Sequence, residues 1–115
     1  MDRDGELRLV DGGYSGYEGS EGRLEFHYDG GWNTVCDDSW DETDATVACQ
    51  QLGYSYGEDV YEAYFGEGDG RIGLDNVDCT GEEDRLLDCD NDGLFSHDCG
   101  HSEDAGVICI CKLFF

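Results

Sequence analysis

The sequence predicts an α+β domain that is mainly β, contains one helix and is stabilised by disulfides. Apolar residues come in short segments rather than long blocks, and only residues 41–53 repeat them at clear helical spacing. Seven cysteines are scattered through 115 residues with no Cys-x-x-Cys pair, which is typical of a small domain from an oxidising compartment. This length leaves room for one modest core. We therefore expect a single extracellular domain.

The N-terminal third is expected to supply the first strands. Residues 1–6 are expected to form a frayed lead-in, residues 7–10 a strand, and residues 11–22 a glycine-rich loop. Residues 23–36 predict a hairpin, because apolar and polar residues alternate on both sides of an Asp-Gly-Gly turn.

The helix is predicted over residues 41–53. Asp41 or Thr43 can cap its first turn, which is acidic, and Gly53 can end it. Residues at helical spacing should face the sheet; these are Ala45, Ala48, Cys49 and Leu52.

The C-terminal half contains fewer regular patterns. Residues 54–71 predict a long tyrosine-rich loop, and residues 72–79 a strand. Residues 81–89 suggest a short second helix with two leucines inward, residues 90–104 a loop, and residues 105–110 the last strand.

The charge excludes several partners. The chain has 29 acidic and 6 basic residues, a net charge of −23. Nucleic acid, heparin-like chains and anionic lipid all require a basic surface, whereas this field repels anions and gathers cations. No apolar stretch approaches the roughly 20 residues that span a bilayer. We expect no nucleic-acid binding and no direct membrane insertion.

Residues 97–106 (HDCGHSEDAG) hold a cysteine, two histidines and three acids. His97, Cys99 and His101 would suit zinc if the thiolate were free, but in an oxidising compartment Cys99 is expected to be disulfide-bonded. The same reasoning disfavours a cysteine nucleophile. Acids occur everywhere in the chain, so pairs of them do not identify a glycosidase, and nothing marks a pocket for a general acid. We expect no enzymatic activity.

Residues 88–95 (DCDNDGLF) match the first half of an EF-hand calcium loop. The bidentate glutamate of that loop would fall where Cys99 stands, so an EF-hand is excluded. A weak, open calcium site and a solvated turn remain the two interpretations of this segment.

Acidic groups also lie beside several cysteines. Asp37 and Asp38 follow Cys36, Asp75 and Asn76 precede Cys79, and Asp98 and Glu103 flank Cys99 and His101. If Cys36 is bonded to Cys99, three or four of these carboxylates face one another, which is costly unless a hard cation lies between them. Ca²⁺ suits such a site best, with Mg²⁺ as the alternative; otherwise the acids extend into water.

Three segments together resemble a scavenger receptor cysteine-rich (SRCR) domain. They are GRLEFHYDGGWNTVCDDSWDETDATVACQQLGY (22–54), FGEGDGRIGLDNVDCTGEEDRLLDC (65–89) and HDCGHSEDAGVIC (97–109). The resemblance implies one domain over residues 7–110, with a curved, mostly antiparallel sheet of about six strands cradling one α-helix. Residues 111–115 form a C-terminal tail.

The resemblance also implies the disulfide pairing. Ser20 or its neighbours and Tyr54 stand where the eight-cysteine group has an additional pair, so the chain is similar to the six-cysteine group A. The implied bonds are Cys36–Cys99, Cys49–Cys109 and Cys79–Cys89. Cys111 is left over, and either a disulfide-linked dimer or a truncation within a longer protein would explain it.

Two cation sites carry over from the family. Asp37, Asp38 and Glu103 would form the first, and Asp75 with Asp98 the second. The histidines would position the loop rather than bind metal. Residues 24–32 are a candidate contact surface, with candidate ligand contacts at Glu25, His27, Asp29 and Trp32.

The implied function is calcium-dependent recognition outside the cell, in a secreted protein or a receptor ectodomain. The implied ligands belong to innate immune pattern recognition: microbial surface polymers, modified lipoproteins or glycoproteins. Near the strand that carries basic clusters in some relatives only Arg23 is present, amid acids, so a bound cation would have to supply the positive charge. The alternatives are an acidic structural or adhesive module that binds Ca²⁺ diffusely, and an accessory domain of a larger protein.

Overall fold

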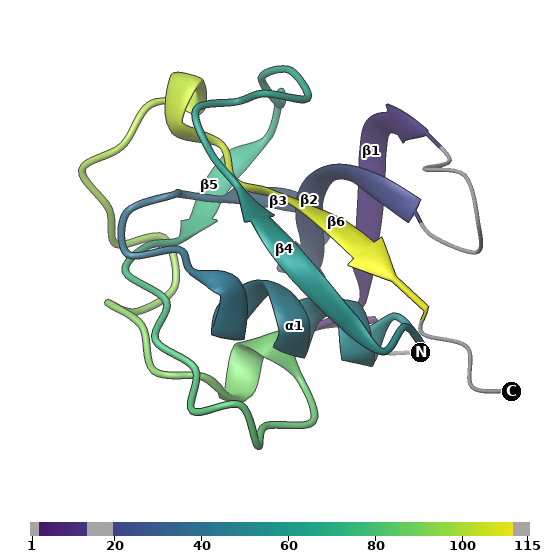
Figure 1. The fold of residues 1–115 in the computed structure, drawn as a ribbon. Coiled ribbons are helices and arrows are strands. Elements are labelled where there is room, and N and C mark those ends of the chain that lie inside the picture. Colours follow the sequence, from purple (N-terminus) through teal and green to yellow (C-terminus); the bar gives the residue numbers. More distant parts are fainter. Residues whose placement is uncertain (1–2, 14–19, 112–115) are drawn as a thin grey trace, which may run out of the picture.

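The structure is a computed structural model that describes residues 3–13 and 20–111. Its strands are β1 (Leu7–Gly13), β2 (Ser20–Tyr28), β3 (Gly31–Val35), β4 (Tyr56–Val60), β5 (Arg71–Leu74) and β6 (Gly106–Ile110). The single α-helix is α1 (Glu42–Gln51), and two 3₁₀ turns are η1 (Leu86–Asp88) and η2 (His101–Glu103). Figure 1 shows α1 lying against one face of the curved sheet.

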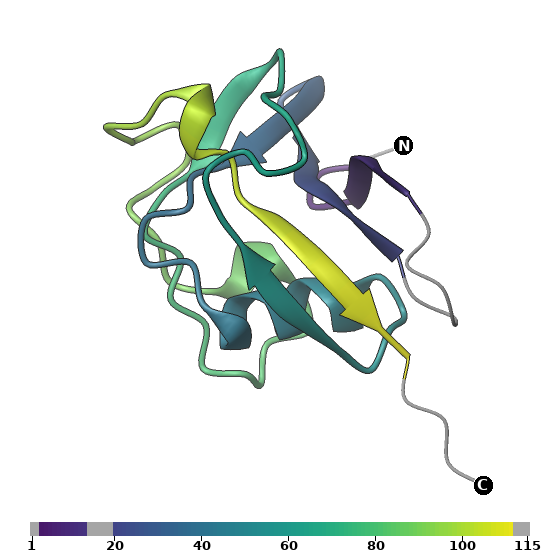
Figure 2. The ribbon, with the colours of Figure 1, turned by 45° about the horizontal axis from the view of Figure 1, so that its top comes forward.

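The sheet has the order β4-β6-β2-β3-β5, with β1 paired to β2. Every pair is antiparallel except β3 with β5. Strand β1 pairs along β2 over residues 21–26, β6 pairs with residues 20–23 of β2, and β3 with residues 25–28. Because a strand has two edges, β3 and β6 share the edge of β2 opposite β1 and meet end to end (Figure 2). The expected curved, mostly antiparallel sheet around one helix is confirmed.

The core lies between the helix and the sheet. Its largest fully buried side chains include Trp40, Phe26, Leu24 and Leu74. Helix α1 packs on β4 and β6, and the Cys49–Cys109 disulfide joins it to β6. A Cβ on Gly57 of β4 would lie 2.4 Å from Cys49 Sγ, so only glycine lets the two elements approach this closely. None of the helices in the described residues is long and apolar enough to cross a membrane.

The helix begins as the sequence predicts. Asp41 is the N-cap, and its carboxylate accepts from Asp44 N (3.0 Å) while the Asp44 carboxylate accepts from Asp41 N (2.9 Å). This reciprocal capping box satisfies two backbone donors of the first turn. Asp44 is fully buried and also accepts from Cys79 N (2.8 Å). It therefore ties the helix start to the loop closed by Cys79–Cys89.

The expected loop at 54–71 is wrong, because it contains strand β4 (Tyr56–Val60). Only Gly57 of this strand is buried, so it lacks the apolar alternation that identifies a strand. It forms because β6 pairs along all five of its residues. The strand expected over residues 72–79 ends at Leu74. Within the segment expected to be a loop over residues 11–22, β1 extends to Gly13 and β2 begins at Ser20, and residues 14–19 lie outside the described residues.

Two other segments also differ from expectation. The second helix predicted over residues 81–89 is only η1, in which Leu86 is buried and Leu87 half-buried. In the lead-in, Gly5 N donates to His27 O (2.8 Å), and Gly5 O accepts from Gln51 Nε2 (2.8 Å). Residues 3–6 are therefore part of the packed domain.

The buried Asp44 carboxyl predicts an unusual pH dependence of stability. Burial raises the pKa of Asp44 to about 7, against the hydrogen bonds that lower it. Since the unfolded chain binds this proton more weakly, the free energy of unfolding from this group falls as pH rises between about 4 and 7. Asp44→Asn should remove about 1–3 kcal/mol of that pH dependence. Urea denaturation at pH 4.5, 6 and 7.5 measures it, and an unchanged slope in the variant would contradict the prediction.

Candidate cation-binding site

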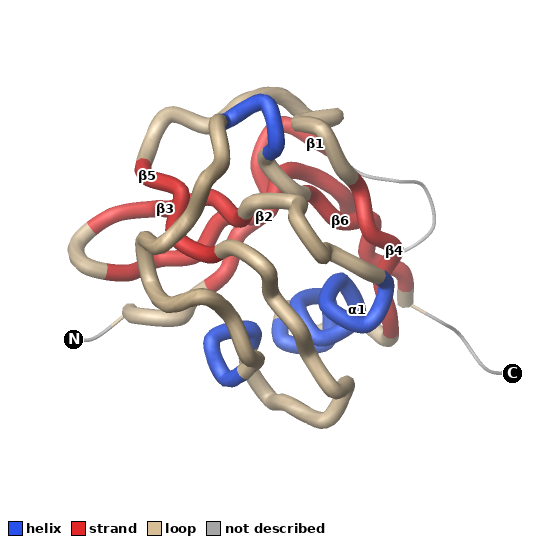
Figure 3. Tube along the Cα trace, turned by 90° about the vertical axis from the view of Figure 1, so that its left-hand side faces the viewer, coloured by secondary structure: helices blue, strands red, loops and turns tan. Residues whose placement is uncertain are grey.

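Three strand ends meet at one corner of the sheet. The end of β3 is bonded to the segment before β6, because Ala105 N donates to Val35 O (2.7 Å) and Asp37 N donates to Glu103 O (2.8 Å). The parallel strand β5 ends alongside β3, where Cys36 N donates to Leu74 O (2.9 Å). Figure 3 labels β3 and β5 side by side. The residues that follow β3 and β5 and precede β6 therefore converge.

The Cys36–Cys99 disulfide brings a fourth segment to this corner. Cys36 Sγ lies 3.5 Å from Glu103 Oε2, and Cys99 Sγ lies 3.6 Å from Asp38 Oδ2. Disulfide sulfurs carry no hydrogen and are not thiolate ligands, so these distances are packing contacts. The bridge lies between the two carboxylates and holds them near each other.

The convergence produces two overlapping acidic groups. Asp37, Asp38 and Glu103 each place a carboxylate oxygen within 4.8 Å of the others, and so do Asp38 and Asp75. Oxygens on opposite sides of a Ca²⁺ ion with bonds of about 2.4 Å lie about 4.8 Å apart. Carboxylate oxygens within this distance of one another could therefore share one hard cation such as Ca²⁺. Asp38 belongs to both groups, whereas the sequence assigned it to one site.

The electrostatics of this corner are unfavourable without a cation. Burial raises the pKa of the Asp38 carboxyl, and the charges of Asp75, Glu103, Asp98 and Asp37 raise it further. Burial also raises the pKa of Asp75, which is 1% exposed, although hydrogen bonds from backbone N–H groups oppose this. Both shifts have the direction expected where carboxyl groups are partly buried and close together, because burial and neighbouring negative charges disfavour the ionised form.

Asp98 lies beside Asp75 rather than within either acidic group. Both line a hollow of about 240 Å³, with Asn76, Asp92, Ser96 and His97. Asp92 belongs to the segment that resembles half of an EF-hand loop, and Asn76 Nδ2 donates to its Oδ2 (2.7 Å). The hydrogen bond from Asp92 N to Asp75 O (3.2 Å) holds the segment around Asp92 next to Asp75 and Asn76. The assignment of Asp75 and Asp98 to a second cation site stays a prediction.

The histidines support the loops around the site. His101 Nδ1 lies 2.8 Å from Asp104 Oδ2 and Nε2 lies 2.8 Å from Gly70 O. Burial would lower the pKa of His101, but the bonds to Asp104 and Gly70 raise it above the ordinary value. His97 Nδ1 accepts from Cys99 N (3.1 Å). With Cys99 in a disulfide, the zinc alternative lacks its thiolate.

Comparison with known proteins agrees with this architecture. A family model described as scavenger receptor cysteine-rich domain matches residues 14–110. The chain belongs to the SRCR family. A similar solved structure is the third SRCR domain of murine neurotrypsin, with 50% identity over 90% of this chain and 94% of that one and a TM-score of 0.79. Another is the dimeric form of the SRCR domain of mouse MARCO, with 47% identity over 81% of this chain and 89% of that one and a TM-score of 0.76.

SRCR domains are non-enzymatic, extracellular ligand-recognition modules. This one carries the three disulfides that the resemblance implied, Cys36–Cys99, Cys49–Cys109 and Cys79–Cys89. Cys111 is unpaired within the described chain and half-buried beyond the end of β6. Residues 112–115, the rest of the expected tail, lie outside the described residues.

The expected contact surface on residues 24–32 requires a correction. Glu25 is 4% exposed and cannot contact a ligand directly, because it accepts from Arg8 Nη2 (2.6 Å) and Arg23 Nε (2.8 Å). Trp32 is half-buried, with the Arg8 guanidinium 4.2 Å from its ring centroid and His27 against its edge. Asp29 is exposed and pairs with Arg71.

Arginines from other strands lie on the same sheet as Arg23, the arginine expected near the strand that carries basic clusters in some relatives. Arg8 of β1 and Arg71 of β5 accompany Arg23 of β2, which is buried and bonded to Asp11 and Glu25. Each of these arginines is paired with a carboxylate. The sheet therefore offers no arginine free of an acidic partner among the residues described.

The His101–Asp104 pair predicts a second pH effect. Because the folded pKa of His101 is raised, its contribution to stability is full below the unfolded pKa of about 6.5 and is lost as pH rises through the folded value. His101→Gln keeps a donor but no charge. Its deficit in unfolding free energy should be larger at pH 5.5 than at pH 8.5. Urea denaturation of both proteins at the two pH values measures this, and equal deficits would disprove it.

Proposed function

We propose that this SRCR domain binds Ca²⁺ at the corner formed by Asp37, Asp38, Asp75 and Glu103 and recognises ligands through the bound ion. The proposal depends on one observation: Asp38 has a carboxylate oxygen within 4.8 Å of carboxylate oxygens from Asp37 and Glu103 in one group and from Asp75 in the other. Asp98, at the neighbouring hollow, would complete the second site.

The donor chemistry favours Ca²⁺ over other ions. Carboxylate oxygens are hard ligands, and no imidazole or thiolate belongs to either of the two groups. The oxygens come from separate strand ends with independent orientations. Ca²⁺ accepts six to eight oxygens in loose geometry, whereas Mg²⁺ requires a near-ideal octahedron, so Mg²⁺ is the weaker alternative.

The charge distribution supports recognition through the ion. Each of the five arginines in residues 3–13 and 20–111 is ion-paired, and the whole chain carries −23. A sulfated, phosphorylated or carboxylated ligand would be repelled unless a cation supplied positive charge. Microbial surface polymers, modified lipoproteins and acidic glycoproteins are such ligands, in keeping with a role in innate pattern recognition.

Calcium titration tests the proposal. Wild type should show one or two defined sites by calorimetry, and Asp38→Asn, which removes the carboxylate common to both groups, should weaken them by at least about tenfold. Asp84→Asn removes the same charge from an exposed loop position and should bind like wild type. Binding should weaken as pH falls, because protons compete at Asp38 and Asp75, whose pKa values are raised.

The competing function is an acidic adhesive module with diffuse calcium binding. Many weak sites that are equally insensitive to both substitutions would favour it. Capture of dextran sulfate with calcium but not with chelator, lost in Asp38→Asn, would complete the case for recognition through the ion. Capture that is unaffected by chelator would contradict it.

We also propose that Cys111 can link two copies of the domain. It lies just beyond β6, outside the three intrachain disulfides, and the similar MARCO domain is described in a dimeric form. Purified oxidised protein should run as a dimer on a non-reducing gel, and Cys111→Ser should run as a monomer. A monomer band for oxidised wild type would refute the linkage.

A further inference from the structure

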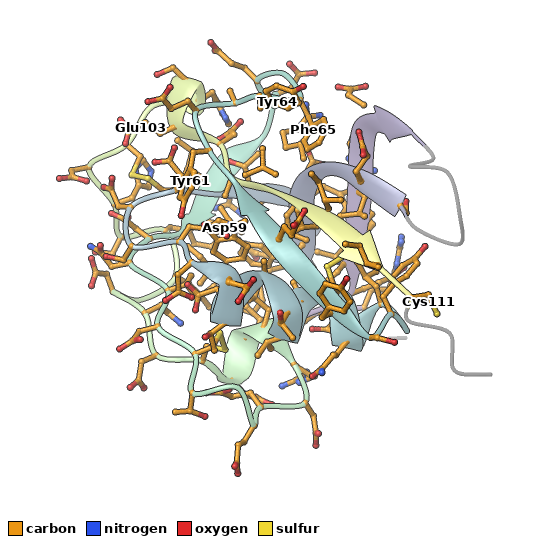
Figure 4. The ribbon with its side chains drawn as sticks, viewed as in Figure 1. Asp59, Tyr61, Tyr64, Phe65, Glu103 and Cys111 are labelled. Carbon is orange, nitrogen blue, oxygen red and sulfur yellow. A yellow bond between two sulfur atoms is a disulfide. The ribbon has the colours of Figure 1, made fainter. Side chains whose placement is uncertain are left out.

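Two exposed tyrosines occupy one tight turn between β4 and β5. Tyr61 is 43% exposed and Tyr64 is 76% exposed, so they make up half of the large hydrophobic side chains found exposed among the described residues. Figure 4 shows both near the end of the molecule that carries Glu103. We call residues 61–64 the tyrosine turn. Exposed aromatic rings of this kind are typical of contact surfaces.

The backbone of the tyrosine turn is fixed in an unusual conformation. Tyr64 N donates to Tyr61 O (3.2 Å), and the two residues between them, Glu62 and Ala63, have φ of 56° and 50°. Neither is glycine, so this left-handed backbone costs about 1–2 kcal/mol for each residue. Hydrogen bonds offset the cost: Glu62 N donates to Asp37 Oδ2 (2.7 Å) and Ala63 N donates to Asp104 O (3.0 Å).

Both tyrosine rings are also held in place. The Tyr64 ring meets Phe65 edge-on, with centroids 5.0 Å apart, and Phe65 packs against Gly106, where an added Cβ would lie 2.8 Å from its ring. The Tyr61 hydroxyl donates to Trp40 O (2.6 Å) and contacts the Asp59 carboxylate. Rings already fixed lose little conformational entropy when a partner binds.

The surroundings of the turn are negative. The Asp59 carboxylate beside the Tyr61 hydroxyl raises the pKa of Tyr61 to about 12, with further contributions from burial and from the charges of Asp41 and Asp37. Glu62 and Glu67 are exposed on the same loop. The nearest arginine, Arg23, reaches Gly66 O but is buried and paired with two carboxylates. The basic groups near the turn, Arg23 and His101, are thus both paired with carboxylates, and the exposed charges on the turn itself are acidic.

The same molecule shows what such an arrangement accepts. The Arg8 guanidinium lies 4.2 Å from the Trp32 centroid and pairs with Glu25, and that of Arg71 lies 3.9 Å from the Phe95 centroid and pairs with Asp29. In both places an aromatic ring and an acid together hold an arginine. The tyrosine turn offers the ring and the acids without an arginine of its own.

We propose that the tyrosine turn binds an arginine-rich basic segment of a partner protein, with a guanidinium stacked on Tyr64 and paired with Glu62. Arginine fits better than lysine, because its planar, weakly hydrated guanidinium stacks on aromatic faces. Binding of a basic segment goes beyond the calcium-dependent function proposed above. Calcium should weaken this binding, whereas it should strengthen the binding of acidic ligands. Since Asp37 belongs both to the acidic corner and to the support of the turn, a cation bound there would weaken a basic ligand, not strengthen it.

Binding of a fluorescent octa-arginine peptide, measured by anisotropy at 50 and 150 mM NaCl with chelator, tests the proposal. Tyr64→Ala and Glu62→Gln should each weaken binding about three- to fivefold, as expected for one exposed cation–π or ionic contact. Tyr64→Phe should retain binding. Tyr56→Ala, at an exposed tyrosine of β4 that pairs with Ile110, and Glu82→Gln, at an exposed acid of another loop, are the matched controls and should behave as wild type.

Two outcomes would overturn the proposal. Equal affinity of wild type, Tyr64→Ala and Tyr56→Ala would mean that the peptide adsorbs over the whole acidic surface. Salt-insensitive binding of neutral oligosaccharides that is lost in Tyr64→Ala, with peptide binding unchanged, would assign the turn to sugars. The Asp38→Asn variant separates this test from that of the calcium site, because it should lose calcium binding yet keep the dependence of peptide binding on Tyr64.

Discussion

The end of strand β3 is the constraint on which the candidate site depends. Val35 and Cys36 are buried, and they are bonded through the main chain to Ala105 and Leu74 and through sulfur to Cys99. A bridge across 63 residues contributes about 4 kcal/mol in the chain-entropy model. Carboxylates placed directly after such a fixed point cannot separate to relieve their repulsion. The disulfide and the main-chain hydrogen bonds at the end of β3 therefore hold the carboxylates together despite their repulsion.

The parts of the fold that follow from local sequence could be predicted. The helix and its cap follow from Asp41, the acidic first turn and Gly53, and the hairpin follows from the alternation around Leu24 and Phe26. Strand β4 could not be found in this way, because its sequence YGEDV has no buried apolar side chain and forms a strand through pairing with β6. The partner strand β6 carries a strand-like pattern of its own, but its pairing with β4 leaves no periodic signal in the sequence of β4.

In the candidate site, too, some features could be predicted from the sequence and others depend on how distant segments pair. Its acidic residues were identified by resemblance, but the double role of Asp38 depends on the parallel pairing of β3 with β5, which places Asp75 beside it. Glu25 was misassigned because its position opposite Leu24 and Phe26 indicates solvent. Its register partner on β1 is Arg8, and Arg23 approaches from the same strand, so the two guanidinium groups bury it.

Positive and negative charges are distributed unevenly over the domain. Four of the five arginines in the described residues pair with acids on or beside strands β1, β2, β3 and β5, so that side of the sheet is locally neutralised. The acids of the corner and of the tyrosine turn have no arginine partner among the described residues, and they contribute to the excess negative charge; they are Asp37, Asp38, Asp75, Glu103 and Glu62. A cation at the corner would change the field at the tyrosine turn as well, because Asp37 supports both. If Ca²⁺ binds at the corner as proposed, it would make the field at the tyrosine turn less negative, which would weaken a basic ligand there.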